Sequence, residues 1–106
     1  MIARTWHGAV PAEKADAYQK YLLETGVLDY QRTPGNLGVH VLRRNEKNVA
    51  HFLLLTLWDS LDSIKAFSGD NAEQARYYPQ DEAYLLELEP NAIHYEVLAT
   101  PPIRQC

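Results

Sequence analysis

The sequence predicts an α+β fold in which helices cover one face of a four-stranded antiparallel sheet. Three observations lead to this prediction. Residues 49–58 form an almost uninterrupted apolar run, VAHFLLLTLW, which is shorter than the roughly 20 residues of a membrane-spanning helix and suits a strand covered on both faces. Three further runs alternate in the manner of strands. Two regions show the three-to-four-residue apolar spacing of amphipathic helices.

Residues 2–10 alternate as the first strand, and a helix is expected to follow them. Pro11 suits the first turn of a helix, where its missing N–H is not needed. The helical spacing continues to about residue 25, and Gly26 is expected to end the helix in the left-handed conformation that glycine adopts readily. Residues 27–32 are compatible with either a loop or a short turn of helix.

A hairpin is expected after the first helix. Residues 33–36, Thr-Pro-Gly-Asn, are typical of a type II turn, in which proline fixes the second position and glycine supplies the positive φ of the third. The second strand is expected at residues 37–44 and the third at residues 49–58. The polar residues between these two strands make a loop of hairpin length.

The C-terminal half is expected to contain helices and then the fourth strand. Residues 59–60, Asp-Ser, can cap a helix that runs to about residue 68. A capping-box pattern at residues 70–73 predicts a further short helix, and Asp81 could cap one more. The fourth strand is expected at residues 91–98.

This order of elements is that of the split βαβ, ferredoxin-like arrangement. The length of 106 residues fits a single domain over residues 1–106. Such a fold places its helices on one face of the sheet, yet the strands carry apolar side chains on both faces. The uncovered face would expose more apolar surface than a monomer usually tolerates. We therefore expect a homodimer in which sheet packs against sheet across a two-fold axis.

Composition argues against several classes of partner. Ten basic and fourteen acidic side chains give a net charge of −4, which is unlike the basic surface of a nucleic-acid-binding protein. No segment is long enough to span a membrane, and the first residues lack the apolar segment of a signal peptide. The single cysteine, Cys106, cannot form a disulfide within the chain, which fits a reducing compartment. We expect a cytoplasmic protein.

Four histidines fall in the predicted strands: His7, His40, His51 and His94. Their spacing matches no metal-ligand pattern, so no metal site is predicted. Each could be a structural histidine satisfied by a hydrogen bond. His51 could instead be a catalytic base, because it lies in the most apolar strand, where burial favours the neutral imidazole. A neutral imidazole can accept a proton from a phenol or an enol.

Aromatic and charged side chains supply the other candidates. Trp58 ends the central strand and is either a core residue or one wall of a site for a flat ligand. Tyr77 and Tyr78 precede Pro79 in an irregular segment that could cover a cavity. The candidates for contacts with a ligand are Trp58, Phe67, Tyr77, Tyr78, His40 and His7. Three arginines could hold an anion or be solvated: Arg4, Arg43 and Arg76. Four carboxylates are expected on a solvated face: Asp81, Glu82, Glu87 and Glu89.

The run from Leu57 to Val97 resembles the second half of the antibiotic biosynthesis monooxygenase (ABM) domain. The resemblance starts at Leu57-Trp58-Asp59-Ser60, continues through Ala75 and Tyr77-Tyr78-Pro79, and closes at His94-Tyr95-Glu96-Val97. The early strand and the turn at residues 33–36 are similar too. Members of this superfamily are dimeric α/β barrels. They include cofactor-independent monooxygenases that oxidise polycyclic phenols, haem-degrading enzymes and proteins with no demonstrated activity.

The resemblance indicates the fold more strongly than the reaction. Haem-degrading members carry an asparagine on the first strand, a tryptophan late in the second helix and a histidine ten residues later. This sequence has no asparagine in residues 2–10 and has Phe67 and Tyr77 at the other two places, so haem degradation is not expected. The resemblance implies a small homodimeric oxygenase that acts on an aromatic or enolisable small molecule without a bound cofactor. The alternatives are a non-catalytic dimer that binds a hydrophobic metabolite and a structural dimer with a filled interior.

Overall fold

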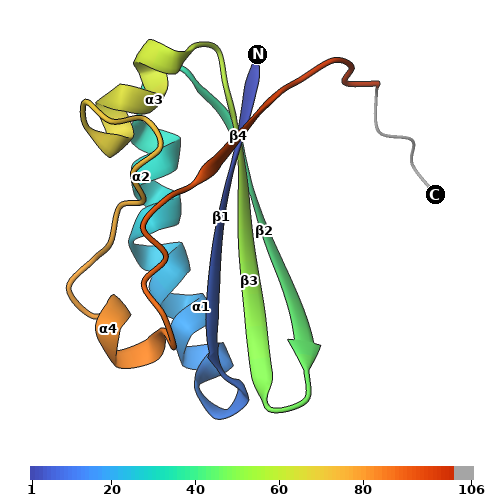
Figure 1. Cartoon of the computed structure of the whole chain (residues 1–106), viewed down its shortest axis with the longest axis vertical. Helices are drawn as coiled ribbons and strands as arrows, with labels where there is room; N and C mark the ends of the chain where they lie inside the picture. Colours follow the sequence, from blue (N-terminus) through green and yellow to red (C-terminus); the bar gives the residue numbers. More distant parts are fainter. Residues whose placement is uncertain (102–106) are drawn as a thin grey trace.

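A computed structural model of the protein describes residues 1–101 and consists of a four-stranded antiparallel sheet with helices packed on one face (Figure 1). The strands follow the spatial order β2-β3-β1-β4. Their bounds are β1 Ile2–Pro11, β2 Asn36–Glu46, β3 Val49–Trp58 and β4 Ile93–Glu96. This is the predicted α+β, ferredoxin-like fold, and the apolar run is the inner strand β3. Cys106 lies outside the described residues.

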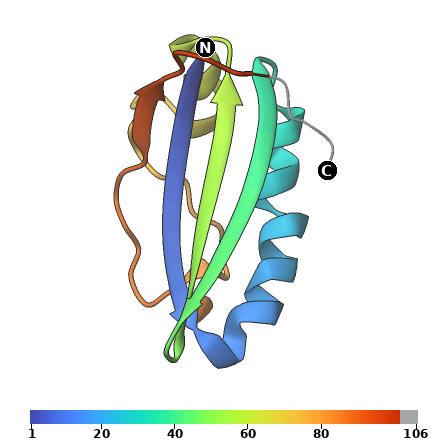
Figure 2. The same cartoon turned by 90° about the vertical axis from the view of Figure 1, so that its right-hand side faces the viewer.

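All the helices lie on one side of the sheet, and Figure 2 views the side on which no helix lies, which we call the open face. A 3₁₀ turn at Ala12–Lys14 leads into the first helix. The helices are α1 Ala15–Glu24, α2 Gly26–Arg32, α3 Leu61–Ser68 and α4 Asp81–Tyr84. No helix within residues 1–101 is long and apolar enough to cross a membrane.

Gly26 does not end the first helix as predicted. It is the first residue of α2, and the break falls at Thr25, whose φ of −121° and ψ of −90° are not helical. Thr25 donates its hydroxyl to the carbonyl of Tyr21 at 2.7 Å. Gly26 is buried, and a Cβ there would lie 3.6 Å from the ring of Tyr78. The residue therefore fits a closely packed site rather than a turn.

The turn and cap chemistry was predicted correctly at three other places. Gly35 and Gly69 have positive φ values of 92° and 93°, as expected for a type II turn and for the end of α3. The amide of Asn36 donates to the carbonyl of Thr33 at 3.1 Å and closes that turn. Ser60 caps α3 by accepting a hydrogen bond from the amide of Ser63 at 3.2 Å.

The helix predicted from residues 70–73 onward is wrong. Residues 73–75 instead pair with residues 90–92, through the amide of Ala75 to the carbonyl of Pro90 at 2.9 Å and the amide of Ala92 to the carbonyl of Glu73 at 2.7 Å. This pairing satisfies backbone groups that a helix would otherwise satisfy. It also precedes β4, which is shorter than the predicted strand at residues 91–98.

The two faces of the sheet differ in what covers them. Alternate side chains of β1 and β3, including Trp6, Val10, Phe52 and Trp58, are buried against the helices. No helix covers the open face (Figure 2), yet it also carries apolar side chains. Its leucines on β3 are half-buried: Leu53, Leu55 and Leu57. Three large apolar side chains on the flanking strands β2 and β4 are about half exposed: Leu42 at 48%, Ile93 at 58% and Tyr95 at 54%.

Candidate functional site

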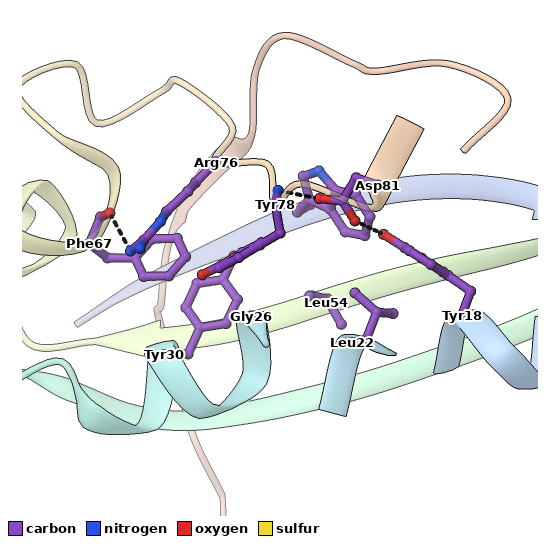
Figure 3. Close-up of a pocket in the computed structure, with 10 residues that line it drawn as sticks. Tyr18, Leu22, Gly26, Tyr30, Leu54, Phe67, Arg76, Tyr78 and Asp81 are labelled. Carbon is purple, nitrogen blue, oxygen red and sulfur yellow. Dashed lines mark hydrogen bonds between the residues drawn. The ribbon is translucent and has the colours of Figure 1, made fainter. Parts of the chain in front are cut away.

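A small pocket lies between the sheet and the helices (Figure 3). Its walls are largely aromatic, and two ionisable side chains of opposite charge, Arg76 and Asp81, also line it. The aromatic walls come from Trp6, Tyr18, Tyr30, Phe67 and Tyr78. The free volume is about 20 Å³, which is room for about one water molecule. An aromatic ligand would therefore need the walls to move.

Asp81 is the buried acid of this pocket, with 4% of its surface exposed. Its Oδ1 accepts a hydrogen bond from the hydroxyl of Tyr18 at 3.1 Å, and its Oδ2 accepts one from the amide of Tyr78 at 2.6 Å (Figure 3). Burial raises the pKa of the Asp81 carboxyl, although these two hydrogen bonds act in the opposite direction. A carboxylate with a raised pKa is a stronger base than one in water.

Tyr18 is suited to remain the hydrogen-bond donor in this pair. Burial, and then the charge of the nearby Asp81 carboxylate, raise the pKa of the Tyr18 phenol. The phenol therefore keeps its proton at neutral pH and directs it to Asp81. This arrangement leaves the carboxylate without a positively charged partner among the described residues.

Three side chains, Asp29, Arg76 and Tyr78, close the pocket toward α2, and we call them the clasp. The hydroxyl of Tyr78 donates to Oδ2 of Asp29 at 2.6 Å, and Nη2 of Arg76 lies 3.4 Å from the same oxygen. The Arg76 guanidinium also lies over the rings of Phe67 and Tyr78, at 5.0 and 5.2 Å from the centroids. The clasp thus ties the irregular segment before α4 to α2.

The wall of the pocket beside the clasp is a stack of aromatic rings over a buried cation. Tyr30 and Phe67 are stacked with centroids 4.1 Å apart, and Trp58 packs against both from behind. Arg4, only 1% exposed, donates to the hydroxyl of Tyr30 and to the carbonyl of Gln74, both at 2.9 Å. Its Nε has no partner among the described residues. A buried guanidinium without a carboxylate gives this wall a positive potential.

The predicted site residues fall into two groups on opposite sides of the sheet. Phe67 and Tyr78 line the pocket, and Trp58 supports its wall. Tyr77 lies at the edge, where its hydroxyl accepts from the indole N–H of Trp6 at 3.3 Å and donates to the carbonyl of Glu89 at 2.5 Å.

The other predicted residues, His7, His40 and His51, lie on the open face. In the strand pairing, His51 stands opposite Ala9 and Arg44, and His7 opposite Leu53. Within this chain, the proposed base His51 is therefore separated by the sheet from the aromatic residues predicted to contact a ligand.

The prediction of a solvated acidic face is wrong for Asp81, which is buried in the pocket. Glu89 is partly exposed and contacts His7. Asp81 was expected to cap a helix, and no pattern within the sequence distinguishes a capping aspartate from a buried one. Its partner Tyr18 is 63 residues away in the chain, so only the folded structure brings the pair together.

The chain belongs to the family described as antibiotic biosynthesis monooxygenase, whose model matches residues 1–76. A search of curated proteins found no match.

Several solved structures share the fold. The "putative antibiotic biosynthesis monooxygenase" from Nitrosomonas europaea is 16% identical, with a TM-score of 0.67 over 93% of this chain and 100% of that one. A protein similarly named from Bacillus cereus is 11% identical, with a TM-score of 0.65 over 96% and 97%. The haem-degrader MhuD from Mycobacterium tuberculosis is 19% identical, with a TM-score of 0.64 over 96% and 100%. At these identities the likeness shows a common fold.

Proposed function

We propose that this protein is a homodimeric oxygenase that acts on an aromatic or enolisable small molecule, without a bound cofactor, in the pocket between the sheet and the helices. The observation that carries the proposal is the buried Asp81 carboxylate in an aromatic pocket, where burial raises its pKa. Membership of the monooxygenase family supports the reaction class, and the pocket supplies the chemistry that the reaction needs.

The reaction would begin with a proton transfer. Asp81 takes a proton from a phenol or from an activated CH₂ group of the substrate, and the resulting anion gives one electron to dioxygen. The two radicals combine through a new carbon–oxygen bond. Loss of water from the hydroperoxide then leaves a carbonyl, so that CH₂ and O₂ become C=O and H₂O. The proton held by Asp81 leaves with that water.

The remaining pocket residues would orient the substrate and stabilise its anion. The rings of Tyr30 and Phe67 offer flat surfaces for an aromatic ring. Arg76 lines the pocket and Arg4 lies behind the Tyr30 hydroxyl, so both place positive charge near a developing anion.

Substrate entry would require the clasp to open. A free volume of about 20 Å³ holds a molecule of the size of water and excludes an aromatic ring. Tyr78 lines the pocket and is held by a hydrogen bond to Asp29, which lies outside the pocket. Movement of Tyr78 away from Asp29 would enlarge the pocket and then exclude water again on closure.

The homodimer is supported by the open face of the sheet. Apolar side chains of β2, β3 and β4 lie there with no helix over them. Covering this face with the same face of a second copy would bury the side chains of both sheets around a two-fold axis.

The pocket residues do not fit a haem. Tyr77, at the place where the resemblance expects a histidine ligand, has its hydroxyl engaged with Trp6 and Glu89. Phe67 stacks on Tyr30 and fills the adjacent space. The proposed reaction therefore does not involve a haem.

The second candidate function is a dimer that binds a hydrophobic metabolite and performs no chemistry. It is favoured by the internal hydrogen bonding of the pocket, in which Tyr18 satisfies Asp81 and Asp29 satisfies Tyr78. A base that already has two hydrogen bonds must exchange at least one of them with the substrate before it can act.

Oxygen consumption tests the proposal. Purified protein is screened in an oxygen electrode against a panel of polycyclic phenols and enolisable ketones, and products are identified by mass spectrometry with ¹⁸O₂. We expect one labelled oxygen in the product and a loss of about 100-fold or more in rate for Asp81→Asn. Asp70→Asn, on the exposed loop after α3, is the matched control and should retain the rate. Panel members that bind without oxygen uptake would favour the second candidate.

A further inference from the structure

Three side chains on the open face form a hydrogen-bonded chain, which we call the Glu89–His7–His51 relay. Oε2 of Glu89 lies 2.5 Å from Nδ1 of His7, and Nε2 of His7 lies 2.9 Å from Nδ1 of His51. The two imidazole rings are stacked with centroids 5.2 Å apart. They come from the adjacent strands β1 and β3, on the side of the sheet opposite the aromatic pocket.

The backbone holds the carboxylate end of this relay in place. β4 pairs only with residues 2–5 of β1, so the following half of β1 has no strand on that side. The segment before β4 covers this edge, and the amide of Leu86 donates to the carbonyl of Ala9 at 2.8 Å. The carbonyl of Glu89 accepts the hydroxyl of Tyr77 at 2.5 Å. These contacts fix Glu89 beside His7.

Hydrogen-bonding rules assign the protons in the relay. An ionised carboxylate only accepts, so Nδ1 of His7 carries a hydrogen. With His7 neutral, its Nε2 accepts, and the hydrogen between the rings belongs to Nδ1 of His51. Nε2 of His51 is then left with a free lone pair, and it has no hydrogen-bond partner among the described residues.

The relay gives a proton that binds this nitrogen a hydrogen-bonded path toward Glu89. When Nε2 of His51 takes a proton, the hydrogen on its Nδ1 can pass to Nε2 of His7. The positive charge then lies next to the Glu89 carboxylate, which stabilises it. Glu89 and His7 are therefore positioning residues: they orient the His51 ring, and the ligand contacts only Nε2 of His51.

Grooves lie on both sides of the His51 ring, and they differ in charge. One, of about 310 Å³, combines the apolar side chains Leu42 and Leu53 with Arg44, which shares the open face with them. The other, of about 450 Å³, is flanked mainly by acidic groups: Glu46, Glu87 and Glu89, with Lys47. Arg44 is paired with Glu46 at 2.5 Å. The guanidinium of Arg43 lies on the other side of the sheet, where it pairs with Asp16 of α1 at 2.8 Å. An anion with an apolar body suits the first groove and is repelled by the second.

We propose that His51 is the proton-accepting group of a second ligand site, on the open face, which binds a small weakly acidic hydroxyl compound with an apolar body. The ligand O–H bond breaks, its proton moves to Nε2 of His51, and the ligand anion stays in the groove over Leu42 and Leu53 beside Arg44. The site is independent of the reaction proposed for the aromatic pocket. In the proposed dimer, the partner's sheet would form the opposite wall of this groove.

The test uses 4-nitrophenol, whose phenolate and phenol forms absorb at different wavelengths. At a pH just below its solution pKa, an excess of the wild-type protein should increase the phenolate absorption saturably. We expect His51→Gln to abolish this increase and Glu89→Gln to weaken binding by about tenfold or more. His40→Gln is the matched control, because His40 is an exposed open-face histidine that lines neither groove.

Nitrogen-15 NMR of the wild-type imidazoles supplies a second readout that needs no variant to fold. On saturation with 4-nitrophenol, the Nε2 resonance of His51 should move from the unprotonated to the protonated range. The proposal is overturned if wild-type protein produces no phenolate increase, if His51→Gln produces the same increase as wild type, or if the His51 nitrogen does not change on saturation.

Discussion

Among single residues, His94 has the environment that most clearly links stability to pH. It faces Arg4 in the strand pairing, and its Nε2 is buried with no partner among the described residues. Burial, and then the charge of Arg4, lower the pKa of His94 below its ordinary value of 6.5. At pH values between the lowered pKa of His94 in the folded protein and 6.5, His94 is protonated in the unfolded chain but not in the folded protein.

It follows that the contribution of His94 to stability is present above about pH 6.5 and is lost as the pH falls through the lowered pKa. We expect the free energy of unfolding to rise with pH more steeply in the wild type than in His94→Gln. Urea unfolding from about pH 5 to about pH 7 measures both slopes. His7, His40 and His51 are common to both proteins, so their effects cancel. Parallel slopes would exclude this role for His94.

Gly8, in the middle of β1, has no room for a larger side chain. A Cβ at Gly8 would lie 2.3 Å from Cη2 of Trp6 and 2.8 Å from Cδ2 of Leu85. Gly8→Ala should therefore destabilise the protein by about 1–3 kcal/mol through overpacking, as measured by urea unfolding. Gly38→Ala is the control, since the nearest atom to its Cβ is 4.0 Å away. Equal stability of the two variants would contradict this account of the Trp6 packing.

At the scale of elements, the clasp should control how the segment before α4 moves. Asp29→Asn removes the carboxylate that Tyr78 and Arg76 share. We expect faster amide hydrogen exchange at residues 76–81, with a loss of global stability below about 1 kcal/mol because the ion pair is partly exposed. Mass spectrometry after deuterium labelling measures this directly.

The control for the clasp is Asp16→Asn, which breaks the exposed pair between Asp16 on α1 and Arg43 and should leave exchange at residues 76–81 unchanged. Protection of that segment to the same degree in Asp29→Asn and the wild type would show that other contacts close the pocket.

The elements also show where local sequence signals suffice. The alternation in β1 and β3, the type II turn at Gly35 and the Ser60 cap each depend on neighbouring residues, and each was predicted. The segment 70–80 was not, because its backbone is satisfied by residues 90–92. A capping-box pattern contains no information about that distant partner.

Less of the candidate site could be predicted from the sequence, because it too depends on contacts between residues that are far apart in the chain. Tyr78 was proposed as a ligand contact because it lies in an irregular segment before Pro79, and Phe67 was proposed from the family resemblance. Both line the pocket, and their contact with a ligand stays a prediction. The assignment of Asp81 to a solvated face was wrong, because its burial depends on Tyr18 in α1. The strand pattern placed His51 in an apolar strand covered on both sides. It could not show that His51 faces away from the helices.

For the whole molecule, the open face should make the protein a dimer. Leu55 lies at the centre of this face on β3, half-buried in the single chain. Leu55→Asp should weaken association at least tenfold, because a charge would be buried without a partner. Sedimentation equilibrium measures the effect. Leu61→Asp, at an exposed leucine on α3 in the helix layer, is the matched control. A monomeric wild type would contradict the packing argument.

We propose the aromatic pocket between the sheet and the helices as the binding site of the small molecule. The most direct measurement is the NMR response of the backbone amides and the two tryptophan indoles to 1-naphthol, a flat phenol. We expect saturable shifts of the Trp6 indole N–H and of the Tyr78 and Asp81 amides, because these three residues line the pocket. Saturation with no change at these three groups would contradict this proposal.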